Sequence, residues 1–143
     1  KTLSLDDARA LVDYNRETGF DDLVNATADR DVQSLDTMLT LLLRVGTQPV
    51  GYLRALQRYF NRLYYIQSQI AEGKSADEVI KSLRPPVFFK QVPALTRHVH
   101  SWSAEAITKA LKLLIDAELA CKTSDLPIIP TSSRKLFQLT QIR

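Results

Sequence analysis

The side chains best suited to chemistry are three arginines that recur every fourth residue, Arg54, Arg58 and Arg62. On a helix this spacing places them on successive turns. A row of guanidinium groups could bind an acidic partner or a phosphate backbone. It could also be the solvated flank of an amphipathic helix, which is the interpretation that the residues alone favour.

Other signals of chemistry are weak. His98 and His100 are two residues apart, so on a helix they point to different sides, and we expect them at the surface or its boundary. Cys121, the one cysteine, lies late in an apolar helix face, which predicts a buried and inert thiol. No glycine-rich phosphate loop is present. We therefore expect no catalytic residue, no metal site and no cofactor.

Length and composition describe one compact domain. The chain has 143 residues, is 45% hydrophobic and carries a net charge of +3, which is too small to indicate nucleic-acid binding. No apolar run approaches the roughly 18 residues of a membrane-spanning helix. A single cysteine fits a reduced, cytoplasmic setting. Because residue 1 is Lys, we expect the chain to begin inside a longer one or to be processed.

The elements that must position these side chains are helices. The fold class predicted from capping residues, glycines and prolines is all-α, a compact bundle of seven to eight helices. The expected helices cover about 4–14, 20–30, 32–45, 49–72, 75–84 and 104–122, the last of these capped by Ser103. A segment from 87 to about 100 precedes Ser103, with Pro93 as either a kink or a fresh helix start. A final helix is capped by Thr131 or Ser132.

The helix at 49–72 carries the widest apolar stripe, so we expect it to be the central element, packed by more than one neighbour. Phe60 lies in that stripe. Trp102, between two expected helices, is predicted to fill the core. Phe88 and Phe89 could form a docking element, but core packing is the prediction that we favour for them.

Three stretches carry a family resemblance that covers about residues 20–122. They are FDDLVNATADRD, LLLRVGTQPVGYLRALQRYFNRLYYIQSQIAEGKSADEVIKSLRPPVFFKQ and WSAEAITKALKLLIDAELACK. Together they resemble the C-terminal part of the delta subunit of bacterial DNA polymerase III, a clamp-loader component. The run from Arg84 to Lys90 is typical of alphaproteobacterial members, and the run from Ala117 to Lys122 also matches. The segment after Cys121 departs from the family pattern.

The resemblance implies two parts of the chain. Residues 1–16 would be the last helix of a preceding AAA+ lid domain, and residues 20–143 would be a helical collar that mediates oligomerisation. This collar would hold the subunit in the pentameric ring that loads the sliding clamp during DNA replication. It would not itself be an enzyme, since any polymerase activity would belong to the holoenzyme.

The resemblance also implies partners. These are the other clamp-loader subunits, of the gamma/tau and delta-prime types, in the bacterial cytoplasm. DNA would be met only indirectly, and neither a membrane nor a small-molecule substrate is expected. Arg54, Arg58 and Arg62 are then candidates for the rim of a partner interface. The alternative is a stand-alone helical nucleic-acid-binding module that uses this basic helix face.

Overall fold

The computed structural model describes residues 20–123 and 128–142. Within these ranges the regular elements are all helical, and no strand occurs. Seven α-helices and one short 3₁₀ helix follow one another: α2 (Asp21–Ala28), α3 (Val32–Arg44), α4 (Pro49–Ala71), α5 (Ala76–Ser82), η1 (Phe89–Gln91), α6 (Val92–Ser101), α7 (Ala104–Thr123) and α8 (Ile128–Thr140). The predicted all-α bundle is confirmed; the helix expected within residues 1–16 lies outside the described residues.

Local signals place most helix ends where the sequence predicts them. Asp31, Ser75 and Ser103 precede α3, α5 and α7. Each side chain accepts a hydrogen bond of 3.1 Å from the backbone N–H three residues later. Pro49 occupies the first turn of α4, where its missing N–H has no intrahelical partner to lose. These residues therefore stabilise the starts of α3, α4, α5 and α7.

The last helix begins earlier than predicted. α8 begins at Ile128 rather than after a cap at Thr131 or Ser132. Pro130 lies in its first turn, a position that tolerates proline because no intrahelical donor is lost there. The hydroxyl of Ser132 is buried inside the bundle, 3.1 Å from the hydroxyl of Tyr52 on α4.

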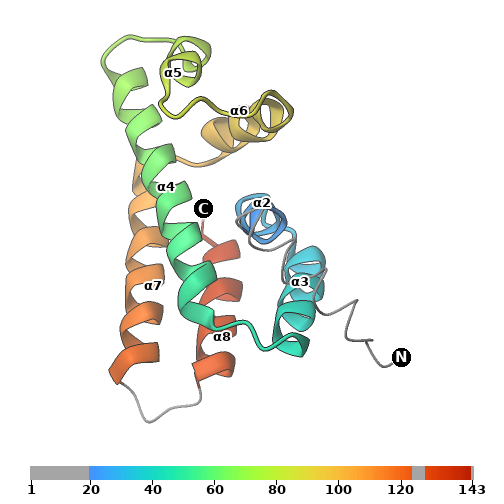
Figure 1. Ribbon diagram of the computed structural model, residues 1–143. Helices are drawn as coiled ribbons and strands as arrows, with labels where there is room; N and C mark the ends of the chain where they lie inside the picture. The colour runs from blue at the N-terminus through green and yellow to red at the C-terminus, as the bar shows by residue number, and fades with distance from the viewer. Residues whose placement is uncertain (1–19, 124–127, 143) are drawn as a thin grey trace.

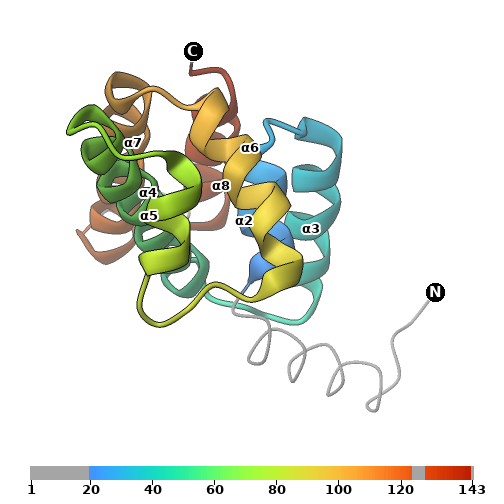
Figure 2. The same cartoon turned by 90° about the horizontal axis from the view of Figure 1, so that it is seen from above.

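The longest helix, α4, is the centre of the bundle, as expected. It packs most extensively on α7 and also contacts α2, α5, α6 and α8. Figure 1 shows α4 and α7 side by side, with α8 next to the lower half of α7. Helices α5 and α6 cover one end of the bundle, and from above α6 crosses α2 (Figure 2). The wide apolar stripe of α4 is thus covered from several sides.

Trp102 is fully buried at the α6–α7 connection, as predicted. Its ring packs edge to face against Phe60 of α4, with ring centroids 4.9 Å apart. Its indole N–H donates a 2.9 Å hydrogen bond to the carbonyl of Ala28 at the end of α2. The guanidinium of Arg30 lies 3.9 Å from the centre of the indole ring. One side chain therefore joins α2 and α4 to the turn between α6 and α7.

Candidate functional site

The arginine row on α4 is divided by the geometry of the helix. Four residues turn an α-helix by about 40° more than one full turn, so a row spaced by four winds around it. Arg58 and Arg62 line one pocket, whereas Arg54 contacts α7. The structure therefore brings two of the three predicted residues together and separates the third.

Arg54 contributes to the contact between α4 and α7. Its Nη2 lies 3.3 Å from Oε2 of Glu118, whose carboxylate also accepts hydrogen bonds from Lys122 at 2.7 Å and from Gln57 at 2.9 Å. These donors, Lys122 first, lower the pKa of Glu118 to about 2. Of the three arginines, Arg54 is thus the one whose charge already pairs with another described residue.

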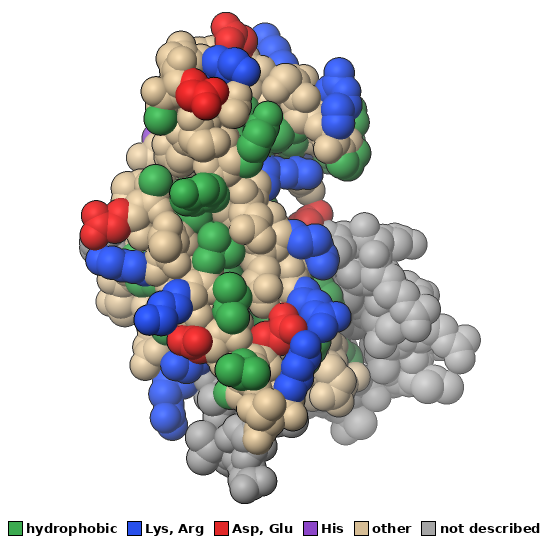
Figure 3. All heavy atoms as spheres, turned by 90° about the vertical axis from the view of Figure 1, so that its left-hand side faces the viewer, with side chains coloured by type: hydrophobic (Ala, Val, Ile, Leu, Met, Phe, Trp, Pro, Cys, Tyr) green, Lys and Arg blue, Asp and Glu red, His purple; other side chains and the backbone are tan. Residues whose placement is uncertain are grey.

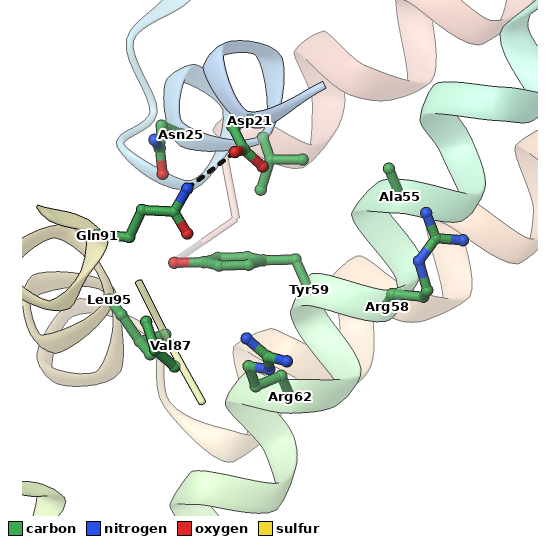
Figure 4. A pocket seen from close by; sticks show the side chains of 10 residues that line it. Asp21, Asn25, Ala55, Arg58, Tyr59, Arg62, Val87, Gln91 and Leu95 are labelled. Carbon is green, nitrogen blue, oxygen red and sulfur yellow. Dashed lines mark hydrogen bonds between the residues drawn. The ribbon is translucent and has the colours of Figure 1, made fainter. Parts of the chain in front are cut away.

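Arg58 and Arg62 line a pocket of about 230 Å³ (Figure 4). Its walls come from α2, α4, the connection after α5, and α6, through Asp21, Val24, Asn25, Ala55, Arg58, Tyr59, Arg62, Val87, Gln91 and Leu95. Gln91 donates a 2.8 Å hydrogen bond to Oδ2 of Asp21, and burial raises the pKa of that carboxyl. Neither Arg58 nor Arg62 forms a hydrogen bond or an ion pair with another described residue. The pocket thus contains guanidinium groups that the described part of the fold does not use.

A chain of hydrogen bonds lies behind this pocket. Tyr59 places its hydroxyl 2.5 Å from Nδ1 of His98, and Nε2 of His98 is 2.7 Å from Oδ1 of Asp29. Arg97 donates to the same carboxylate at 3.0 Å. His98 is completely buried, so its predicted place at the surface or boundary is wrong, while His100 is exposed. Nothing near His98 in the sequence signals this, because Asp29 is 69 residues away.

The order Tyr59, His98, Asp29 matches that of a nucleophile, a base and an orienting carboxylate. Tyr59 is nevertheless not activated as a nucleophile. Burial raises the pKa of its hydroxyl and so favours the protonated form. Burial also lowers the pKa of His98, against the opposite effect of the hydrogen bond with Asp29. The neutral imidazole therefore serves to hold α2, α4 and α6 together.

Large apolar side chains remain exposed on the side of the molecule formed by α7. Ile115 and Leu119 lie one turn apart on this helix and are 56% and 57% exposed. We call these two residues the α7 strip. Figure 3 shows a column of apolar side chains on this side with lysines and arginines on both flanks. Tyr64 and Tyr65 of α4 are also exposed.

The predicted core packing of Phe88 and Phe89 is wrong. The two side chains are 56% and 71% exposed, and their rings contact each other with centroids 4.9 Å apart. They follow Pro85 and Pro86 in a connection that is not an α-helix, and Val87 is the residue of this segment that packs against the core. The docking role considered for this pair is therefore the interpretation that stays open.

The remaining sequence candidates give no reactive centre. Cys121 is half-buried rather than fully buried, and its surroundings raise the pKa of the thiol. No group of three or more His, Cys, Asp or Glu side chains that could hold a metal occurs in residues 20–123 and 128–142. None of the helices in the described ranges combines the length and the apolar character needed to cross a membrane.

The comparisons with known proteins give one curated relative. It is the "Probable DNA polymerase III subunit delta" of Rickettsia prowazekii (strain Madrid E), 33% identical over 93 residues. The chain is similar to a DNA polymerase III subunit. The aligned residues make up 65% of this chain and 29% of the relative, so the match covers less than a third of that protein. No family model matches the chain, and no solved structure matches it significantly.

Proposed function

We propose that this chain is the C-terminal oligomerisation domain of a delta-like clamp-loader subunit. Residues 20–143 would form the collar, and residues 1–16 would belong to a preceding AAA+ lid domain. The domain would hold its subunit in the pentameric ring that loads the sliding clamp during DNA replication. The observation that carries this proposal is the 33% identity to a probable DNA polymerase III subunit delta.

The surface of the bundle supports a role in assembly. The domain already has a well-filled core around Phe60 and Trp102, yet it exposes Ile115, Leu119 and neighbouring apolar groups. Apolar side chains gathered on one face mark protein-binding surfaces, and arginines are enriched at such interfaces. The proposed partners are the gamma/tau and delta-prime types of subunit, in the bacterial cytoplasm. The proposed domain is not catalytic.

Co-purification tests this proposal. The chain, carrying an affinity tag, is co-expressed with the gamma/tau and delta-prime subunits of the same organism, and we expect a complex of defined mass by light scattering. Leu119→Asp should reduce the yield of complex at least ten-fold, because it places a charge on the α7 strip. Thr40→Asp, an exposed change on α3, is the matched control and should assemble normally. A wild-type chain that captures neither subunit would contradict the proposal.

One observation favours nucleic-acid contact as a second candidate. Two exposed aromatic rings, Phe88 and Phe89, stand next to the exposed cation Lys90. Exposed aromatic rings beside cationic groups can stack on the bases of a single strand. Affinity for a labelled oligonucleotide, measured against salt, separates the candidates: contact with phosphates gives a log–log slope of about −0.7 per neutralised phosphate of a single strand. No measurable binding at low salt would remove this candidate.

A further inference from the structure

The pocket between α2 and α4 separates hydrogen-bond donors from an acceptor. On the α4 side, Arg58 and Arg62 supply guanidinium groups that bind no other described residue. Figure 4 shows the head group of Arg62 beside the ring of Tyr59 and that of Arg58 nearer to Ala55. On the α2 side, Asp21 binds Gln91 through Oδ2, and no described residue donates to its Oδ1. A ligand that fits this arrangement has an anionic end and a hydrogen-bond donor.

The charges in the pocket suit a monoanion. Arg58 and Arg62 face one carboxylate, Asp21, which leaves a net charge of one positive unit. A phosphate dianion would meet about twice the repulsion from Asp21 that a carboxylate meets, because it carries twice the charge. A carboxylate would need only the guanidinium groups, which bind carboxylates with paired, charge-assisted hydrogen bonds. The charge pattern thus favours a monoanion such as a carboxylate over a phosphate dianion.

The apolar part of the lining suits a side chain with a short aliphatic stem. Val24, Ala55, Val87 and Leu95 contribute carbon surface between the charged ends. A peptide that carries Glu or Asp combines an apolar stem, one negative charge and backbone N–H donors for Asp21. At about 230 Å³ the pocket has room for one such side chain and part of its backbone.

We propose that this pocket binds the carboxylate of a Glu or Asp side chain from an acidic segment of a partner subunit, with Arg62 and Arg58 as donors and Asp21 as the acceptor for a peptide N–H. This inference rests on the proposed function, since it specifies what a partner of the domain presents. Arg62 holds the carboxylate, and Arg58 contributes from the edge of the pocket. Asp21 selects against more highly charged ligands.

The test is an NMR titration of the 143-residue chain that follows the arginine Nε–H signals. The probe is N-acetyl-glutamate N-methylamide, added to tens of millimolar at neutral pH and low salt. We expect the signals of Arg62 and Arg58 to shift in a saturable way. The signal of Arg44, an exposed arginine on α3 outside the pocket, should not follow. The matching glutamine probe, which lacks the charge, should produce no saturable shift.

Variants make the test specific. Arg62→Gln should weaken binding of the glutamate probe about ten-fold or more, while Arg44→Gln leaves it unchanged. Asp21→Asn should increase binding of inorganic phosphate relative to the glutamate probe, because it removes the opposing charge. The absence of a saturable shift, a glutamine probe that binds equally well, or a wild-type pocket that prefers phosphate would each overturn the inference.

The pocket proposal and the proposed function can fail independently, and the experiments tell the two failures apart. If the wild-type chain co-purifies with its partner subunits, and Arg62→Gln assembles equally well while the glutamate probe does not bind, the pocket proposal is wrong and the oligomerisation role stands. If the wild-type chain captures no subunit, the proposed function itself fails, whatever the titration gives.

Discussion

Replacing Phe60 by alanine tests the core of this bundle. The ring of Phe60 is completely buried and packs edge to face against Trp102 at 4.9 Å and against Tyr59 at 6.1 Å between centroids. Phe→Ala changes in such positions cost about 3–5 kcal/mol, since transfer energy is lost and a cavity remains. For a domain of this size that corresponds to a fall in melting temperature of roughly 10–20 °C.

Phe89→Ala is the matched control, because it is the same change at a side chain that is 71% exposed. We expect it to alter the free energy of unfolding by no more than about 0.5 kcal/mol. The assay is urea unfolding followed by the fluorescence of Trp102, the one tryptophan of the chain, whose ring touches Phe60. Equal losses for the two variants, or a loss below about 1 kcal/mol for Phe60→Ala, would refute the assignment of core and surface aromatics.

Three further outcomes follow from the described contacts. Lowering the pH from about 7 to about 5 should reduce the free energy of unfolding by at most about 1.4 kcal/mol per pH unit. Burial keeps the pKa of His98 below 6.5, so the unfolded chain gains a proton in this range that the folded chain does not. Urea melts at several pH values measure this slope, and a free energy of unfolding that does not change with pH would contradict the prediction. Arg58→Glu should slow association with the partner subunits without changing the melting temperature, as surface plasmon resonance and thermal melts can show, because peripheral charges act mainly on association rates. An unchanged rate would return Arg58 to the solvated flank. Ser103→Ala should lower the free energy of unfolding by about 1 kcal/mol, because α7 loses its N-cap hydrogen bond. Denaturant titration measures this change, and an unchanged free energy would mean that the cap is dispensable.

Short-range signals made most of the fold predictable. Asp31, Ser75 and Ser103 act on backbone groups three residues away, and Pro49 acts on its own turn, so their effects can be inferred from the sequence alone. The apolar residues of α4 recur with the period of a helix, so the sequence alone also predicts which face of α4 is buried. Such signals fail at Pro130, which is compatible with either a break or the first turn of a helix.

Long-range placement was not predictable. His98 enters the core because Tyr59 and Asp29 satisfy both of its ring nitrogens, and these partners are 39 and 69 residues away. Phe88 and Phe89 lie in a connection without helical period, so no pattern indicated which side they face. The division of the arginine row likewise depends on Glu118 of α7, which pairs with Arg54 from 64 residues away.

Two exposed features of the bundle, the α7 strip and the pocket with Arg58 and Arg62, differ in chemical character: the first is apolar and the second is charged. A subunit in a closed ring of unlike partners meets a different neighbour on each side, so it needs two different surfaces. The described bundle offers the apolar α7 strip, formed by Ile115 and Leu119, and the charged pocket with Arg58 and Arg62. Buried apolar contacts supply most of the affinity of an interface, whereas charged groups mainly add specificity and speed. Under the proposed function, the α7 strip would therefore hold one neighbour tightly, and the pocket would select the other by its charge.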